Sequence, residues 1–302
     1  MSAPANSFKS IIYALVANFA IAVAKTTGAI YTGSSSLLAE AVHSFADCGN
    51  QALLIWGLKE AVRAPTADHP LGFGKAIYFW SFIVALMLFS MGGVFSIYEG
   101  LHKISSNEPI QNPWVAIAIL SFGIVAESVS LWGCVREINK VRGTQSLWSW
   151  FRSSRQSELV VILGEDIAAL GGLALALGFI ALAMVSGNPV WDAIGSMAIG
   201  TLLLVVAWLI GAEVKALLIG QSAEPEMLAQ MKKHLTDAPE VIELYNLLTQ
   251  QLGSEIMVAI KARMQPQGSE VALIVAINRV EAGFRAAFPQ VGWIFFEPDV
   301  AD

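Results

Sequence analysis

The sequence predicts an all-α six-helix transmembrane domain followed by a small α+β (αββαβ) cytoplasmic domain. Of the 302 residues, 55% are hydrophobic and only 14% are charged, whereas a soluble domain usually carries roughly 25% charged residues. The mean hydropathy is +0.60, and several apolar stretches reach the ~20 residues that a helix needs to cross a bilayer. The chain turns polar after about residue 221, which predicts a separate soluble domain there.

Six apolar segments are the predicted spans: residues 8–31, 37–62, 76–103, 113–138, 157–186 and 190–218. Residues 33–36 are expected to form a tight turn between the first two spans, and Pro189 is well placed to open the sixth helix. The polar and basic residues 139–156 are predicted to be a loop. The first ten residues are too few and too polar for a signal or transit peptide, so the first span is expected to be retained.

Positive charges predict the orientation of the spans. One side of the predicted membrane domain carries ten basic residues: Lys9, Lys59, Arg63, Lys75, Arg136, Lys140, Arg142, Arg152, Arg155 and Lys215. The other side carries only Lys103, so the positive-inside rule places both termini in the cytoplasm. We expect a multi-pass protein of the inner (plasma) membrane of a bacterial cell. The net charge of −6 argues against nucleic acid as a partner.

Residues 1–221 are the predicted transport domain, and residues 222–302 the cytoplasmic one. The tail carries six Lys or Arg and eleven Asp or Glu, so it is acidic. Its pattern predicts helices at 224–235 and 269–287 and strands at 241–250, 255–264 and 292–297. A layer of this size has a thin core and would gain stability from dimerising.

Ionisable residues inside the second predicted span are the first functional signal. An ionisable side chain at mid-bilayer costs on the order of 3 kcal/mol, so each requires a reason. His43 and Asp47 are four residues apart and share one face of a helix, and Glu40 shares much of that face. An imidazole and a carboxylate at this spacing can both bind one cation. The alternative is a polar contact that only ties helices together; the flanking acids favour the metal site.

The fifth predicted span supplies a second acidic pair, Glu165 and Asp166. Adjacent residues on a helix point about 100° apart, so the two cannot share one face equally. We expect one to meet the cation, and the other a neighbouring polar group or a proton path. Glu127, in the fourth span, is either a proton carrier or the partner of Lys25.

Three further sets of polar residues have weaker interpretations. Lys25 is expected to serve charge pairing or helix packing, and Glu99 and Asp192 near span ends are expected to be interfacial. The loop after the second span contains Asp68 and His69. These two residues could hold a second, weaker ion near the cytoplasmic entrance, or the loop is only a turn shaped by Pro and Gly.

Two of these motifs resemble the cation diffusion facilitator family. Residues 39–47 are similar to its paired metal-ligand motif, and the loop His69-Pro70-Leu71-Gly72-Phe73-Gly74-Lys75 is similar to its HPxGxGK-like loop. Within the family the sequence most resembles the zinc transporter 9 branch. Four segments carry that likeness: residues 36–51, the His69 loop, residues 163–171 and residues 186–200.

The resemblance implies a homodimeric, proton-coupled metal antiporter with a metallochaperone-like cytoplasmic domain. Its transport site would lie between the second and fifth spans, where His43, Asp47 and Asp166 match the family's ligands. Ile162 stands where the family usually has His or Asp. The fourth ligand therefore stays open among Glu165, Glu40 and water.

The expected function is export of a divalent metal from the cytoplasm in exchange for protons, with no tightly bound cofactor and no enzymatic activity. A nitrogen with two or three oxygens suits Zn²⁺, with Mn²⁺, Fe²⁺, Co²⁺ and Ni²⁺ as alternatives. Two other classes remain: a membrane hydrolase with a catalytic zinc on the same residues, and a metal-binding scaffold that regulates partners through the tail. The tail has a single histidine, His234, so we expect no multi-metal sensor in it.

Overall fold

The structure is a computed structural model, and it describes residues 5–106 and 110–301. Residues 1–4, on which part of the N-terminal prediction rests, lie outside the described residues. The chain forms two compact units. The first comprises residues 1–56, 80–147 and 158–213, and the second comprises residues 57–79, 148–157 and 214–302.

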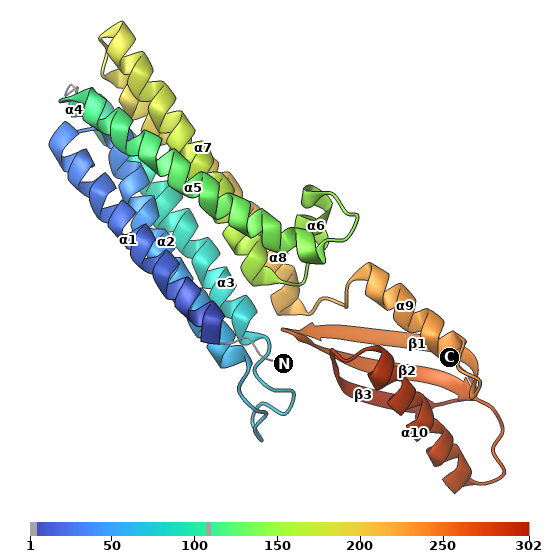
Figure 1. Ribbon diagram of the computed structural model, residues 1–302. Helices are drawn as coiled ribbons and strands as arrows, with labels where there is room; N and C mark the ends of the chain where they lie inside the picture. The colour runs from blue at the N-terminus through green and yellow to red at the C-terminus, as the bar shows by residue number, and fades with distance from the viewer. Residues whose placement is uncertain (1–4, 107–109, 302) are drawn as a thin grey trace. The chain divides into compact units, whose positions relative to one another are not determined.

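Long helices build the first unit and run alongside one another (Figure 1). They are α1 (Ala5–Thr32), α2 (Ser35–Ala61), α3 (Ala76–Met87), the π-helix η1 (Leu88–Val94), α4 (Phe95–Ser106), α5 (Pro113–Val141), α7 (Ser157–Ser186) and α8 (Val190–Ile219). Within the described chain, four stretches are long and apolar enough to cross a membrane: Ala76–Ser105, Pro113–Val141, Ser157–Ser186 and Val190–Ile219. The prediction of a helical membrane domain is thereby confirmed.

The third predicted span is one continuous helical stretch with a π-helix at its centre. Such wide turns are rare and occur often at functional sites. Gly92 and Gly93 lie in η1 and are buried. Opposite them, a Cβ on Gly200 of α8 would lie 2.7 Å from the carbonyl oxygen of Gly93 and 2.9 Å from the amide nitrogen of Ile97. Small residues thus let α8 approach the backbone of η1 and α4, as is common between membrane helices.

This close packing predicts that Gly200→Ala destabilises the helical unit. The added methyl would press on the backbone of η1 and α4, and overpacking of this kind costs about 1–3 kcal/mol. Thermal unfolding of the detergent-purified protein measures the effect. Gly178→Ala on α7 is the matched control, because its Cβ would meet nothing within 4 Å. Equal melting temperatures for the two variants would show that the close approach contributes nothing.

The prediction of a loop over residues 139–156 is wrong in part. Helix α5 continues to Val141, and a short helix, α6 (Leu147–Ser153), follows. Trp150 and Phe151 in α6 are 3% and 7% exposed. Burial of these two aromatic side chains stabilises a helix where the basic composition had suggested a loop.

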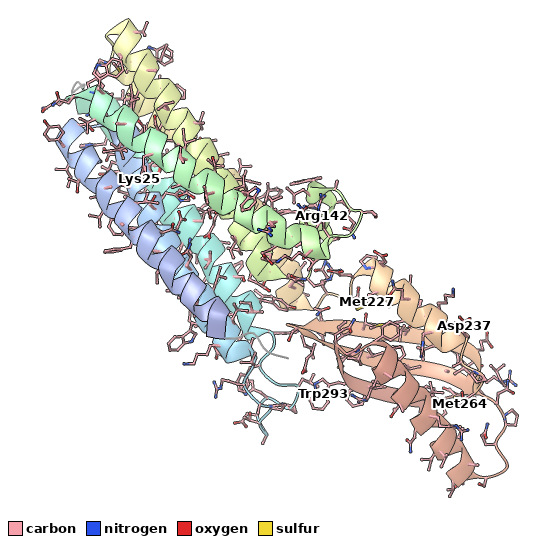
Figure 2. The ribbon with its side chains drawn as sticks, in the orientation of Figure 1. Lys25, Arg142, Met227, Asp237, Met264 and Trp293 are labelled. Carbon is pink, nitrogen blue, oxygen red and sulfur yellow. The ribbon has the colours of Figure 1, made fainter. Side chains whose placement is uncertain are left out.

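The second unit contains a three-stranded sheet covered by two helices. Its elements are α9 (Pro225–Thr236), β1 (Val241–Leu252), β2 (Glu255–Met264), α10 (Glu270–Ala287) and β3 (Val291–Pro298). Strands lie in the order β1-β2-β3, with β1 antiparallel to β2 and β2 parallel to β3. Alternate residues of β2 from Ile256 to Met264 (Figure 2) pack into one core with α9 and α10. A small three-stranded domain after the helical one is thus confirmed.

Asp192 lies near the beginning of α8, as its place near a span end predicted, and it has a partner that the sequence did not predict. Its side chain is fully buried. The hydroxyl of Ser34 donates to its Oδ1 at 2.8 Å, and the backbone N–H of Ser35 donates to its Oδ2 at 2.7 Å. The N–H and hydroxyl of Ser36 also donate to Oδ1. The first N–H groups of a helix have no partner within it; Asp192 of α8 accepts from the first two of α2, and Ser34 Oγ accepts from the third, that of Leu37.

Candidate functional site

The site is built on the polar face of α2. His43 is fully buried, and its Nδ1 lies 3.6 Å from Oδ1 of Asp47, one helical turn further on. That separation is too long for a hydrogen bond. Among the described residues, neither ring nitrogen of His43 has a hydrogen-bond partner. The structure therefore confirms that these two side chains share a face.

A cavity of about 440 Å³ opens beside Asp47. Residues of α1, α2, α5 and α7 line it, and five of them are carboxylates: Asp47, Glu127, Glu137, Glu165 and Asp166. No Lys or Arg stands among the described residues of this lining. Four predicted site residues, from three helices, thus border one cavity whose charge suits a cation. Ile162 lines it too.

The two acids of α7 have different partners, as their adjacent positions predicted. The Asn50 side-chain amide donates to Oε1 of Glu165 at 2.5 Å. The hydroxyl of Ser130 on α5 donates to Oδ1 of Asp166 at 3.1 Å, while Oδ2 of Asp166 has no partner in the described chain. Glu165 is therefore tied to α2, and Asp166 keeps one oxygen available. Asn50 and Ser130 were not among the predicted site residues, although Asn50 stands only three residues after Asp47.

Buried polar atoms without partners are concentrated at this place. Buried polar groups are normally paired, and leaving one unpaired costs about 1–3 kcal/mol. In the described part of the chain, the side-chain atoms recorded as buried and unpaired are Glu40 Oε1, His43 Nδ1 and Nε2, Asp47 Oδ1, Asn50 Oδ1, Gln51 Oε1 and Asp166 Oδ2. All belong to α2 and α7. Oxygens of this kind and a neutral imidazole nitrogen offer lone pairs, which are what a cation requires of its ligands.

Glu40 has a partner that the sequence analysis did not assign to it. Its Oε2 lies 3.3 Å from Nζ of Lys25 on α1 (Figure 2), and Lys25 also donates to Ser44 Oγ at 2.7 Å. Both charged side chains are at most 1% exposed. Charge pairing of Lys25 is thus confirmed, with Glu40 in place of Glu127. Gly172 of α7 leaves room for Glu40, because a Cβ there would clash with Oε1.

Asp68 and His69 lie in the exposed loop between α2 and α3. The His69 ring stacks on Phe73 with 4.4 Å between ring centroids, and His69 and Thr66 exchange backbone hydrogen bonds. These contacts form a turn, which is one of the two interpretations that the sequence allowed for this loop. In the second unit, His234 packs edge-on against Phe284 and Phe288.

The described residues contain no group of three or more His, Cys, Asp or Glu side chains already gathered at metal-binding geometry. The structure instead shows a buried imidazole beside Asp47, and a cavity lined by carboxylates of three helices. Oε1 of Glu165 accepts from Asn50 and Oε2 of Glu40 pairs with Lys25, whereas Oε1 of Glu40 has no partner among the described residues. The described side chains that line the cavity and keep an unpaired buried atom are those of Asp47, Gln51 and Asp166, and His43 lies one helical turn before Asp47.

Comparison with known proteins gives consistent matches. The cation efflux transmembrane domain matches residues 11–219. The chain is 34% identical over 248 residues to "Proton-coupled zinc antiporter SLC30A9, mitochondrial" of Xenopus laevis, covering 81% of this chain and 44% of that protein. It is 31% identical to "Metal tolerance protein C4" of Arabidopsis thaliana, covering 82% and 55%. "Zinc transporter ZitB" of Pectobacterium atrosepticum is 24% identical, covering 89% and 80%. The chain thus spans about half the length of the first two relatives.

Proposed function

Because this chain belongs to the cation efflux family, we propose that it exports a divalent metal ion, Zn²⁺, from the cytoplasm in exchange for protons. The observation that carries the proposal is the set of buried, unpaired side-chain atoms around Asp47. A folded protein keeps such costly groups where a ligand will satisfy them. Relatives named as zinc transporters support the choice of metal, and the printed name of the SLC30A9 relative supports proton coupling.

The proposed ligands are His43 and Asp47 from α2 and Asp166 from α7. One nitrogen and carboxylate oxygens form a set that suits zinc. Asp47 and Asp166 line the same cavity, and this shared lining supports their assignment to one ion. Glu40 and Glu165 then act as anchors held by Lys25 and Asn50, and Glu127 provides a proton path along the cavity wall.

Proton coupling follows from the chemistry of these ligands. Zinc binds a neutral imidazole and ionised carboxylates, so protons and metal compete for the same groups. When the site faces an acidic compartment, protons displace the ion; when it faces the cytoplasm, metal displaces the protons. Rocking of the helices around the site would exchange the two exposures.

Several further features belong to the same proposal. We propose six crossing helices, both termini in the cytoplasm and a homodimer in the inner or plasma membrane. The distribution of Lys and Arg supports the orientation, and the thin core of the small domain supports dimerisation. Mn²⁺, Fe²⁺, Co²⁺ and Ni²⁺ are competing cargoes, and Asp68 and His69 are the proposed entrance for the ion.

Zinc flux under a pH gradient tests the function. Purified protein in proteoliposomes with an acidic lumen should take up external Zn²⁺ and release luminal protons, each followed by a fluorescent indicator. Collapse of the gradient with an ionophore should slow the zinc uptake. Absence of any divalent-metal movement would contradict the transporter proposal and favour a scaffold, and uptake indifferent to the gradient would refute proton coupling alone.

Zinc affinity should also fall as the pH is lowered. Each proton that zinc displaces makes the dissociation constant about tenfold weaker per pH unit below the titration of the ligands. Calorimetric titration of the detergent-solubilised protein in the range from mildly alkaline to mildly acidic pH measures this dependence. A dissociation constant that does not change with pH would show that the ligands bear no exchangeable protons.

A further inference from the structure

The carboxylates that line the cavity of about 440 Å³ differ in their exposure. Glu137, on α5, is 56% exposed, and Glu127 on the same helix is half-buried. The other three carboxylates of the lining are more deeply placed: Asp47 is 13% exposed, Asp166 8% and Glu165 6%. Glu137 therefore lies at the mouth of the cavity, where its lining meets the solvent.

One face of α5 leads from this mouth to a proposed ligand. The hydroxyl of Ser130 donates to Oδ1 of Asp166 at 3.1 Å, so α5 passes beside Asp166 at this point. Glu137 follows Ser130 by seven residues, which places it on the same side of the helix and about 10 Å further along the axis. Cys134, between the two, is buried and also lines the cavity.

Lys140 covers the carboxylate at the mouth. Its Nζ lies 2.6 and 2.7 Å from the two oxygens of Glu137, so the Glu137 side chain is turned towards the end of α5 and away from Asp166. At this separation the two carboxylates cannot share one ion, because a bond from zinc to oxygen is only about 2 Å long. An ion at Glu137 would occupy a separate position.

The pair of Glu137 and Lys140 can open at little cost. Both side chains are more than half exposed, and an exposed ion pair contributes little to stability. The ammonium uses the same two oxygens that an incoming cation would use. A divalent ion, with twice the charge, can therefore take its place.

The neighbouring arginines on this side have other partners. The guanidinium of Arg136 lies 5.5 Å from the centroid of the Trp132 ring. Arg142 (Figure 2) donates from Nη1 to the carbonyl oxygen of Gln145 at 2.7 Å. Neither arginine is among the described residues that line the cavity. Lys140 is thus the basic side chain that meets the acidic mouth.

We propose that Glu137 is a first, transient binding position for the divalent ion at the mouth of the cavity, and that Lys140 competes with the ion for its two oxygens. The inference rests on the proposed transport function and adds the step by which the ion reaches its ligands. A carboxylate at the mouth raises the local concentration of cations. The ion then passes along the face of α5 to Asp166.

Initial rates of Zn²⁺ uptake into proteoliposomes at low ionic strength test the role of Glu137. A unit charge about 10 Å from a divalent ion corresponds to roughly a fourfold effect in water. Glu137→Gln should therefore lower the rate about fourfold at limiting zinc and leave it unchanged at saturating zinc. Glu137→Asp keeps the charge and should retain the wild-type rates. Molar salt should remove the difference, because it screens charges at this distance.

The control is Glu226→Gln, which removes the same charge from an exposed position in the first turn of α9. Glu226 does not line the cavity, so this variant should take up zinc at the wild-type rate. A loss in Glu226→Gln as large as that in Glu137→Gln would show that only the net charge matters, and would overturn the inference.

Lys140→Met tests the competition. It should raise the uptake rate at limiting zinc, because both oxygens of Glu137 become available. In the Glu137→Gln background the same change should have no effect, since the group for which Lys140 competes is gone. An equal rise in both backgrounds would show that Lys140 acts only through its charge, and would refute the competition.

The outcomes also separate this inference from the function on which it rests. Wild-type protein that moves no divalent metal would refute the proposed function. Wild-type uptake that Glu137→Gln leaves unchanged at limiting zinc would overturn the entry position and leave the transporter intact. If Asp68→Asn lowers that rate and Glu137→Gln does not, the ion enters at the loop between α2 and α3 instead. A loss in Glu137→Gln at saturating zinc as well would assign Glu137 a structural role.

Discussion

Replacement of Asp47 or Asp166 by asparagine is expected to lower zinc uptake into proteoliposomes by about two orders of magnitude or more. Loss of a group that only supports a metal ligand already costs 10–100-fold, and these carboxylates are the proposed ligands themselves. Each also contributes a negative charge to the cavity. The described residues that line this cavity include no Lys or Arg. Asparagine has nearly the same size as aspartate and keeps one side-chain oxygen. A loss of zinc uptake would therefore be due to the missing carboxylate charge.

The control for this prediction is Asp237→Asn, the same change at an exposed position after α9 (Figure 2). It should transport zinc at the wild-type rate. Normal transport by both Asp47→Asn and Asp166→Asn would contradict the metal site as a whole. If only one of the two variants loses zinc transport, only the helix that carries that residue supplies a carboxylate ligand.

Lys25→Met is expected to produce the largest loss of stability. It leaves Glu40 buried without its counter-charge, and removal of one partner of a buried pair costs about 3–5 kcal/mol. The double variant Lys25→Met/Glu40→Gln should regain much of that loss, because both charges are then gone. Thermal unfolding of the four proteins of this double-mutant cycle measures the coupling.

A second ion pair provides the comparison for Lys25. Lys140 lies 2.6 Å from Glu137, and both side chains are more than half exposed. Lys140→Met should therefore change the stability by less than about 1 kcal/mol. An equally small effect of Lys25→Met would mean that Glu40 takes up a proton or a new partner at little cost.

The length of the apolar stretches was sufficient to predict the long helices, because a helix needs about 20 predominantly apolar residues to cross a bilayer. The alternation of residues 241–264 predicted β1 and β2 for a related reason, since only one face of the sheet meets the core. Helix α6 was missed because it is only seven residues long and lies in a polar, basic stretch, although three of its residues are aromatic. The π-helix at Leu88–Val94 has no signature that would distinguish it from ordinary helix.

The predicted site was recovered where its residues stand close in sequence. His43 and Asp47 share a face because their spacing matches the helical period. The pairing of Glu40 with Lys25, and of Asn50 with Glu165, depends on which helices are neighbours, and a single sequence does not contain that information. Gln51 was overlooked because an uncharged amide in a membrane span carries less cost than a charge, so it drew no explanation.

Asp192 places a limit on how α2 can move. The carboxylate that binds the first N–H groups of α2 is supplied by α8, so a twist of α2 about its own axis would strip those groups of their acceptor. Each amide uncovered in this way would cost about 1–3 kcal/mol. The beginning of α2 is in this sense a pivot, and the ligands further along the helix can shift only by a swing about it.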